Sequence, residues 1–357
     1  MKTIKAGIVG GTGYTGVELV RLLSAHPNVA LQWLTSRSEA GTPVADIFPS
    51  LRGVTDLAYQ DFGDDSLSTM SECDVVFFAT PHGVAMRQAE ALVKAGVKVI
   101  DLAADFRLQS LVEFETWYAH KHACPELLKS AVYGLPEVNR DKIASANVIG
   151  NPGCYPTTAI LGMKPIIDLQ NKQNNRLIDK RIIVDAKSGV SGAGRQAKLA
   201  LNYAETTDNF KAYGVAGHRH LPEIEQGLAV VLNSQFNHKI RFVPHLVPMI
   251  RGMFTTIHLE LTKQGQQVDW QSIFSQSYQD EAFIDVMPAG VIPDTRSVRA
   301  SNKLRIAVVQ NSERGELTVL VVQDNLVKGA AGQAVQNMNC LFALPETVGL
   351  AIVPVVP

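Results

Sequence analysis

Cysteine is scarce in this chain of 357 residues. The four cysteines, Cys73, Cys124, Cys154 and Cys340, lie far apart, and no two of them form a CxxC pair. Small disulfide-stabilised proteins need a denser and more regular set of cysteines, so this spacing argues against a disulfide framework. We therefore expect a protein of the reducing cytoplasm.

Long apolar runs and an excess of one charge are also missing. No apolar run reaches the ~18 residues that span a bilayer, and the N-terminal segment is too short and too interrupted by glycine to be a signal peptide. The net charge is −1 and no basic run occurs, which argues against nucleic acid or a membrane surface as the main partner. We also find no repeat, low-complexity segment or flexible linker, so a small-molecule partner is expected.

The first 150 residues alternate short apolar runs with helical patterns, and 46% of the whole chain is hydrophobic. Such alternation predicts a parallel sheet covered by helices on both faces. The length predicts two domains, of which 1–150 is the Rossmann-like one. The predicted elements are strands at Ile4–Val9, Val29–Ser36, Asp74–Thr80 and Val97–Ala103, with a helix at Val17–His26.

After about Asn151 the pattern changes to longer strand-like runs, several of which alternate apolar and polar residues. This alternation is typical of a sheet with one covered face, and it predicts a second, α+β domain with a mixed sheet over 151–325. A helix is expected at Trp270–Asp280. The last segment, 326–357, contains a helical pattern at Gly329–Leu344, which we expect to pack back on the first domain.

The glycine-rich segment "GGTGYTG" follows the first strand and precedes the first helix. It contains Gly11, Gly13 and Gly16 in the spacing GxGxxG. A tight glycine turn lets backbone N–H groups approach a pyrophosphate at a helix N-terminus, where the helix dipole favours anions. The alternative is a glycine turn that binds nothing, but the flanking strand and helix favour a dinucleotide site.

The end of the second strand indicates which dinucleotide is bound. An NAD site usually places Asp or Glu about twenty residues after the glycines, where it accepts the ribose 2′-hydroxyl. Here the segment is "TSRS", and Ser36 and Arg37 suit a 2′-phosphate, with no carboxylate to repel it. The sequence therefore predicts NADP as the cofactor, unless Arg37 is only a solvated surface residue.

Cys154 lies in "GNPGCYPT", where Pro156 is typical of the first turn of a helix. A cysteine at a helix N-terminus has its thiolate stabilised by unpaired N–H groups and the dipole, and the same N–H groups can donate to an oxyanion. Gly153 allows a substrate to approach closely. Burial in the core is the usual fate of cysteine and is the alternative here; for the other three cysteines it is the expected one.

A nucleophilic cysteine needs a base, and "GHRHLPEIEQ" supplies candidates. His218 and His220 are two residues apart, so in an extended segment both side chains can point to the same side. Glu223 and Glu225 lie near the start of the helix that follows, where a carboxylate can orient one histidine. A zinc site and a purely structural histidine pair are the alternatives.

Two further segments can bind anions. The loop "SGVSGAGR", from Ser188 to Arg195, combines serines, glycines and an arginine, with Ser191 at its centre. "DFRL" adds Arg107, a candidate clamp for a phosphate or carboxylate. A solvated loop is the alternative for each.

Taken together, these motifs resemble N-acetyl-gamma-glutamyl-phosphate reductases, the NADP-dependent enzymes of arginine biosynthesis. The resemblance runs in order from the first strand to residue 350. It rests on "GGTGYTGVEL", "TSRS", "ATPHG", "DLAADFRL", "YGLPE", "GNPGCYPT", "SGVSGAGR", "GHRHLPEIEQ", "DNLVKGAAGQAVQNMN" and "PETVGL". The chain departs from the family at Ala103, where serine is frequent, and before "PET", where tryptophan is frequent.

The resemblance implies roles for individual residues. Cys154 is the nucleophile, and the acid/base is His218 or His220, with His220 slightly favoured. Arg107, Ser191, Arg195 and Glu223 are expected at the substrate. The implied cofactor positions are Gly11, Thr12, Gly13, Tyr14, Thr15, Gly16, Ser36, Arg37, Thr80, Pro81, His82, Ser188, Gly189 and Asn325, the last holding the nicotinamide carboxamide.

The implied reaction is reduction of N-acetyl-glutamyl phosphate to the semialdehyde through a thioester on Cys154. The resemblance also implies a homodimer or homotetramer, with dimerisation through the second domain. Aspartate-semialdehyde dehydrogenase, which performs the same chemistry on a shorter substrate, is the nearest alternative. A nucleotide-binding module without catalysis is the other, and the presence of Cys154 beside both histidines and Arg107 argues against it.

Overall fold

The computed structural model describes residues 3–63, 66–234 and 236–355, and these divide into two compact units. Unit 1 contains the chain up to Pro152 together with Gly194–Gln196 and Ala330–Ile352. Unit 2 contains Gly153–Ala193, Ala197–Gly329 and the residues from Val353. Within the described ranges, no helix is both long and apolar enough to cross a bilayer.

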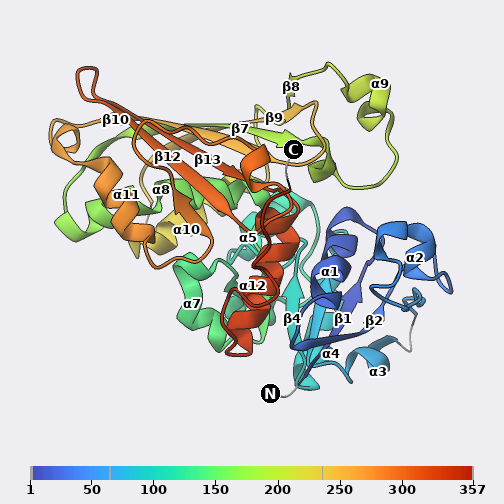
Figure 1. Cartoon of the computed structure of the whole chain (residues 1–357). Helices are drawn as coiled ribbons and strands as arrows, with labels where there is room; N and C mark the ends of the chain where they lie inside the picture. The colour runs from blue at the N-terminus through green and yellow to red at the C-terminus, as the bar shows by residue number, and fades with distance from the viewer. Residues whose placement is uncertain (1–2, 64–65, 235, 356–357) are drawn as a thin grey trace. The chain divides into compact units, whose positions relative to one another are not determined.

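Unit 1 is built on a parallel sheet of six strands in the order β2-β1-β3-β4-β6-β5 (Figure 1). Its inner strand β3 is apolar and buried throughout, as expected for a strand covered on both faces. The strands are β1 (Ile4–Val9), β2 (Val29–Leu34), β3 (Val75–Phe78), β4 (Lys98–Asp101), β5 (Val132–Tyr133) and β6 (Val148–Gly150).

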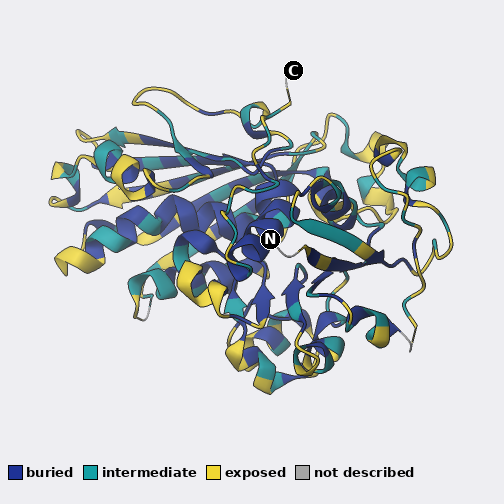
Figure 2. Ribbon diagram, turned by 60° about the horizontal axis from the view of Figure 1, so that its bottom comes forward, coloured by how far each residue is buried: buried dark blue, intermediate teal, exposed yellow. Residues whose placement is uncertain are grey.

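Helices and turns surround this sheet, and most of their exposed residues lie on outer faces and in loops (Figure 2). The helix α12, close to the C-terminus, packs against α1 and α7 within unit 1. The helices are α1 (Tyr14–Ser24), α2 (Val44–Ile47), α3 (Ser66–Met70), α4 (Ala85–Lys94), α5 (Leu111–Tyr118), α6 (Pro125–Ser130), α7 (Pro136–Ala144) and α12 (Gly332–Leu341), with a 3-10 turn at Pro49–Leu51.

Unit 2 contains a mixed sheet of seven strands in the order β11-β12-β13-β10-β7-β9-β8. The neighbours β12, β13, β10 and β7 are antiparallel, whereas β7 pairs with β9 in parallel through a crossover that includes helix α10. The strands are β7 (Ile178–Gly189), β8 (Lys211–Ala212), β9 (Lys239–Val247), β10 (Met253–Leu261), β11 (Ile284–Val286), β12 (Leu304–Asn311) and β13 (Glu316–Gln323).

The long helix α8 (Cys154–Gln173) covers this sheet, packing on β10 and β13, and α10 (His220–Leu232) packs beside it. Most of α8 is buried, including Pro165 in its interior. The remaining elements are α9 (Tyr203–Thr206), α11 (Trp270–Tyr278), 3-10 turns at Val190–Ala193, Leu199–Leu201, Gly265–Gln267 and Arg296–Val298, and a π-helical turn at Val327–Ala331.

The predicted fold class is therefore confirmed: a Rossmann-like unit, a mixed-sheet α+β unit and a C-terminal helix that belongs to the first unit. Helix boundaries differ from the prediction. The first helix begins at Tyr14 rather than Val17, because Gly13 itself is the N-cap. The C-terminal helix begins at Gly332 rather than Gly329, because a π-helical turn comes first.

Candidate active site

The glycine turn between β1 and α1 forms the floor of a cavity in unit 1. Gly10 has a φ of +88°, a conformation that side chains strongly disfavour. A Cβ on Gly16 would lie 2.2 Å from the Gly10 carbonyl oxygen, so only glycine lets α1 approach the turn this closely. Gly13 is the N-cap of α1, and no side chain accepts from the first N–H groups of the helix there. These N–H groups are oriented to bind an anion.

The cavity has a volume of about 570 Å³, which is within the range of small-molecule sites. The hydroxyl oxygen of Thr80 is buried and has no hydrogen-bond partner among the described residues, so it can bond to a ligand. No lining residue is acidic. The lining residues are Val9, Gly10, Thr12, Gly13, Thr35, Ser36, Arg37, Ser38, Phe62, Ala79, Thr80, Pro81, Val84, Arg195 and Gln196.

The residues that sequence reasoning assigned to the 2′-phosphate lie in this cavity. The Ser36 hydroxyl is 3.2 Å from the Thr12 hydroxyl, which joins the end of β2 to the glycine turn. Arg37 is exposed at the cavity, as a residue that meets a solvated phosphate should be. The hydroxyl groups, the arginine and the absence of acidic residues from the lining fit an NADP molecule.

Arg195 also lines this cavity, although the sequence placed it with the substrate loop. Its guanidinium donates to the Thr12 carbonyl at 3.2 Å and lies 5.0 Å from the centre of the Phe48 ring. The short segment Gly194–Gln196 belongs to unit 1, unlike the rest of the loop. These contacts associate Arg195 with the cofactor cavity, while a contact with substrate stays a prediction.

Cys154 is the first residue of α8, with Gly153 as the N-cap. The predicted helix start is thus confirmed, and Cys154 is partly exposed whereas the other three cysteines are buried. The Gln323 side chain donates to the Cys154 carbonyl at 2.8 Å. A Cβ on Gly329 would lie 2.9 Å from the Cys154 Cβ, so the backbone after β13 approaches the cysteine directly. Cys154 is therefore packed against the segment that ends β13 and follows it.

Glu223 connects the cysteine helix with the histidine helix. Its carboxylate is fully buried and accepts the N–H of Gly153 at 2.7 Å. Glu223 itself lies in the first turn of α10, three residues after His220, so the two side chains share a face of that helix. The buried Glu223 side chain thus links the first turns of α8 and α10.

The two histidines lie close together, but not in an extended segment, so that part of the prediction is wrong. His220 is the first residue of α10, and His218 precedes it in a turn closed by the Leu221 N–H. Their ring centres are 4.8 Å apart. The ring centre of Tyr155, the residue after Cys154, lies within 6 Å of both ring centres. The two histidines therefore lie next to the start of α8, the helix that begins with Cys154, within unit 2.

His218 and His220 differ in their electrostatic surroundings. The N–H of His220 donates to Nδ1 of His218 at 3.1 Å, which places the proton of a neutral His218 on Nε2. Burial and the neighbouring Arg219 guanidinium lower the pKa of His218 to about 4. His218 is therefore neutral at physiological pH. Across the described residues, no group of three or more His, Cys, Asp or Glu side chains is placed to hold a metal ion.

Sequence reasoning missed two tyrosines of this site. The Tyr213 hydroxyl donates to the Tyr155 hydroxyl at 3.1 Å, and Tyr155 donates to the His245 carbonyl at 3.2 Å. The Tyr213 ring also lies 5.6 Å from the ring of His218. Tyr155 directly follows Cys154, the predicted nucleophile, and this position was a usable signal. Tyr213 stands 59 positions from Cys154 in the sequence, so no local pattern links them.

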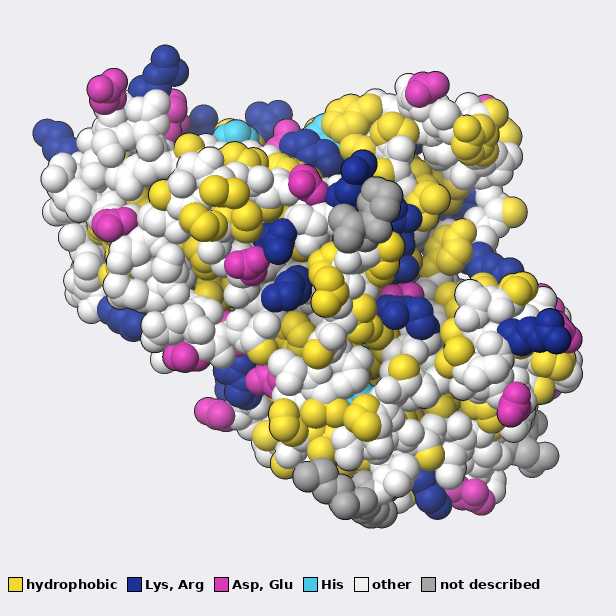
Figure 3. All heavy atoms as spheres, in the orientation of Figure 1, with side chains coloured by type: hydrophobic (Ala, Val, Ile, Leu, Met, Phe, Trp, Pro, Cys, Tyr) yellow, Lys and Arg dark blue, Asp and Glu magenta, His cyan; other side chains and the backbone are white. Residues whose placement is uncertain are grey.

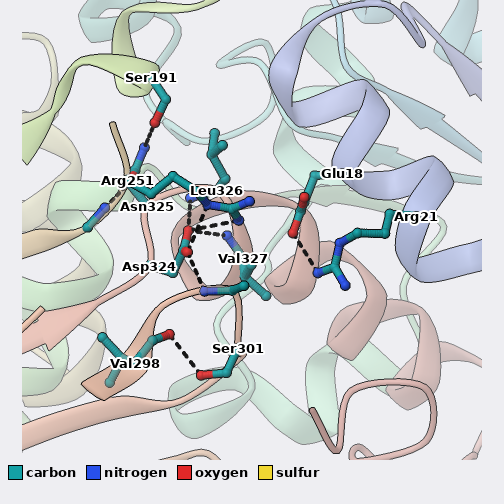
Figure 4. A network of polar contacts seen from close by, with 12 residues as sticks. Glu18, Arg21, Ser191, Arg251, Val298, Ser301, Asp324, Asn325, Leu326 and Val327 are labelled. Carbon is teal, nitrogen blue, oxygen red and sulfur yellow. Dashed lines mark hydrogen bonds and ion pairs between the residues drawn. The ribbon is translucent and has the colours of Figure 1, made fainter. Parts of the chain in front are cut away.

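Ser188, Gly189, Ser191 and Asn325 form a compact polar cluster in unit 2. Asn325 accepts the Gly252 N–H at 2.8 Å and donates to the Ser191 hydroxyl at 2.9 Å (Figure 4). The N–H groups of Gly189, Val190 and Ser191 donate to backbone carbonyls of residues 249–252. These three N–H groups are therefore used to hold the loop in its conformation. An anion bound at this loop would have to be held by side chains rather than by these N–H groups.

Arg107 is buried in unit 1, where its guanidinium donates to the carbonyls of Asn151 and Leu102 at 2.7 and 2.8 Å. These bonds fix the backbone that leads from β6 toward the cysteine. His82 lies edge-on to Tyr118, with ring centres 4.9 Å apart. A contact of either residue with a ligand stays a prediction.

Comparisons with known proteins agree with this arrangement. The family model described as "Semialdehyde dehydrogenase, NAD binding domain" matches residues 5–146. The model described as "Semialdehyde dehydrogenase, dimerisation domain" matches residues 154–325. Together they cover most of the first sheet, the whole second sheet, and the segments that hold the cavity and Cys154.

Full-length relatives are highly similar. A protein of Psychrobacter arcticus named N-acetyl-gamma-glutamyl-phosphate reductase is 73% identical over 99% of this chain and 100% of its own length. A protein of the same name from Bordetella avium is 59% identical over 99% of this chain and 98% of its own. The protein of the same name from Acinetobacter baylyi is also 59% identical, over 99% of this chain and 100% of its own length.

Solved structures share the fold at much lower identity. Aspartate semialdehyde dehydrogenase II of Vibrio cholerae superposes with a TM-score of 0.72 at 19% identity, covering 96% of this chain and 99% of that one. Aspartate semialdehyde dehydrogenase of Candida albicans, solved with NADP, superposes with a TM-score of 0.69 at 19% identity. This superposition covers 97% of this chain and 100% of that one. At this identity the likeness shows the fold alone.

Proposed function

Because the chain belongs to the N-acetyl-gamma-glutamyl-phosphate reductases of the semialdehyde dehydrogenase family, we propose that it reduces N-acetyl-L-glutamyl 5-phosphate to the 5-semialdehyde with NADPH, releasing phosphate, in arginine biosynthesis. The observation that carries the proposal is Cys154 at the start of α8, beside the His218–His220 pair. Full-length relatives of that name at 57–73% identity support the substrate.

The cavity of unit 1 is the proposed NADP site. The glycine turn from Gly11 to Gly16 would hold the pyrophosphate, and Ser36 and Arg37 the 2′-phosphate. Thr80, Pro81 and His82 would lie along the cofactor, with Ser188, Gly189 and Asn325 at the nicotinamide. When bound, NADPH supplies the hydride that the reduction requires.

Cys154 performs the covalent chemistry. Its thiolate, stabilised by the α8 N-terminus, attacks the acyl carbon; the S–C bond forms and the C–O bond to phosphate breaks, with its electron pair leaving on phosphate. The product is a thioester on Cys154. After reduction to a thiohemiacetal, the C–S bond breaks, sulfur leaves as thiolate and the carbonyl of the semialdehyde forms. Exclusion of water protects the thioester from hydrolysis.

His220 is the proposed acid/base. A group that shuttles a proton near pH 7 must exist in both charge states there, and the pKa of His218, lowered to about 4, disqualifies that residue. His220 lies on the same helical face as Glu223, whose buried side chain can orient the imidazole. His220 takes the thiol proton before attack, donates it to the oxygen as the thiohemiacetal forms, and takes it back as the C–S bond breaks and sulfur leaves as thiolate. Neutral His218 accepts the His220 N–H and orients the segment.

Recognition of the acyl phosphate is assigned to Arg107, Ser191, Arg195 and Glu223. A doubly charged leaving group needs cationic and hydroxyl partners, and Ser191 already lies in a buried polar cluster with Asn325. Lys, Arg, Asp and Glu are all spread over the molecular face drawn in Figure 3, which supports a small-molecule partner rather than a nucleic acid.

Assembly and domain organisation are also proposed. The match to a dimerisation-domain model over residues 154–325 supports a homodimer or homotetramer that forms through this part of the chain. The proposed location is the cytoplasm, where the four widely spaced cysteines stay reduced. The proposed domains are 1–150 for the cofactor, 151–325 for catalysis and dimerisation, and 326–357 for the C-terminal helix and tail.

The function is tested by phosphate-dependent reduction of NADP with N-acetyl-glutamate semialdehyde. We expect turnover by the wild type, at least 10²-fold slower turnover of aspartate semialdehyde, and near-complete loss in Cys154→Ser. Cys73→Ala is the matched control, because burial raises the pKa of the Cys73 thiol to about 11 and keeps it inert. Faster turnover of aspartate semialdehyde would reassign the substrate.

A further inference from the structure

Two fully buried aspartates follow β4 in unit 1, and the reaction described above uses neither. Asp101 ends the strand, and Asp105 follows four residues later in the segment "DLAADFRL". Burying a carboxylate is unfavourable unless hydrogen bonds or a counter-charge compensate it. Their partners therefore indicate what this part of the fold must hold in place.

Asp105 bonds to the segment that connects β3 with α4. One carboxylate oxygen accepts the Gly83 N–H at 2.8 Å, and the other accepts the Met86 N–H at 3.1 Å. Helix α4 has no capping side chain of its own. A carboxylate from 19 residues further along the chain thus caps the helix and fixes the turn before it.

The segment held by Asp105 forms one wall of the proposed NADP cavity. Ala79, Thr80, Pro81 and Val84 all line the cavity, and the Thr80 hydroxyl is the buried group available to a ligand. Gly83, at the point where Asp105 binds, has a φ of +86°. The hydrogen bond from the Gly83 N–H to Asp105 therefore holds the backbone of residues 80–83 in the conformation in which it lines the cavity.

The backbone of Asp105 is itself held by two residues, Asp101 and His122. Its N–H donates to Asp101 at 2.9 Å, and its carbonyl oxygen lies 2.7 Å from Nε2 of His122. Asp101 also accepts the Ala103 N–H at 3.0 Å. Burial and the neighbouring Asp105 carboxylate raise the pKa of Asp101, while the Arg107 guanidinium opposes this. The carboxylate of Asp105 is thus presented by a rigid support rather than by a mobile loop.

From these contacts we infer that Asp105 is a positioning residue for the cofactor. It holds the Thr80–Gly83 wall of the cavity in the conformation that NADP(H) requires, without contacting the cofactor itself. The inference rests on the proposed function, since it takes this cavity as the NADP site. Loss of the Asp105 carboxylate should therefore weaken cofactor binding. It should leave the reactivity of Cys154 unchanged, because Cys154 belongs to unit 2.

The test is Asp105→Asn, which keeps the shape but offers one acceptor oxygen to two N–H donors. NADPH binding is measured by fluorescence titration, together with the KM for semialdehyde and the rate of Cys154 alkylation without cofactor. Loss of one charge-assisted hydrogen bond predicts about a ten- to hundredfold rise in the Kd for NADPH. We expect the other two quantities to stay within about twofold, since neither depends on that bond.

Asp269→Asn is the matched control, because Asp269 caps α11 by accepting the Ser272 N–H at 3.1 Å, in unit 2. It should leave the Kd for NADPH unchanged. Equal effects of both variants, or an unchanged Kd in folded Asp105→Asn, would overturn the inference. If Asp105→Asn does not fold, Asp105→Glu, which keeps both acceptors but displaces them, carries the same prediction. A wild type that does not bind NADPH would refute the proposed cofactor itself, before any variant is compared.

Discussion

At the scale of single residues, the histidine pair shows how neighbours with the same side chain acquire different roles. His218 and His220 lie 4.8 Å apart, yet Arg219 and burial act on His218, while Glu223 shares a helical face with His220. The chemistry requires one histidine that exchanges protons at neutral pH and tolerates a second that does not. This division is testable without measuring turnover.

We predict that His218 stays neutral down to about pH 4 and that this makes stability depend on pH. The unfolded histidine has a pKa near 6.5, so between about pH 6.5 and 4 the unfolded state binds a proton that the folded state does not. Lowering the pH through this window therefore lowers the free energy of unfolding. NMR of the imidazole nitrogens gives the pKa directly.

Urea unfolding between pH 4 and 7 gives the consequence for stability, with His218→Gln as the comparison. The variant should show a shallower dependence on pH in this window. A folded-state pKa of His218 near 6.5, or identical pH dependence in the variant, would contradict the assignment of the two histidines.

At the scale of elements, the turn between β1 and α1 uses its glycines for two different purposes. Gly16 permits close packing, since a Cβ there would lie 2.2 Å from a backbone oxygen. Gly13 has a φ of −69°, and its nearest atom to an added Cβ is 3.9 Å away, so it has room for a methyl group. Because Gly13 has no side chain, a ligand can approach the N-terminus of α1 closely.

Exchanging each glycine for alanine should separate these purposes. Gly16→Ala should lower the free energy of unfolding by about 1–3 kcal/mol through overpacking. Gly13→Ala should leave stability within about 0.5 kcal/mol but weaken NADPH binding. Chemical unfolding and NADPH titration of both variants provide the check. Unimpaired binding by Gly13→Ala would remove this turn from the cofactor site.

Much of this element order was predictable because its signals are local. The strand–glycine turn–helix pattern placed β1 and α1, and Pro156 after Cys154 placed the start of α8. The geometry of His218 was predicted wrongly, because a turn closed by the Leu221 N–H replaces the extended segment. Tyr213 and Asp105 were not predicted as functional, since each acts on residues far away in the sequence.

At the scale of the whole molecule, the proposed function assigns cofactor binding to unit 1 and covalent chemistry to unit 2. The cavity with the glycine turn belongs to unit 1, and Cys154 with its histidines belongs to unit 2. The proposed covalent intermediate is compatible with this division, because phosphate would leave before hydride transfer begins. The central claim of the account is therefore the thioester on Cys154.

The measurement that tests this claim most directly is a pre-steady-state burst in the reverse direction. Wild type is mixed with N-acetyl-glutamate semialdehyde and NADP in the absence of phosphate, and NADPH is followed by absorbance. We predict a burst of about one NADPH per chain, because the thioester then accumulates with no phosphate to release it. Mass spectrometry should find the acyl group on Cys154. Steady NADPH formation without a burst, or a burst retained in Cys154→Ser, would contradict the account.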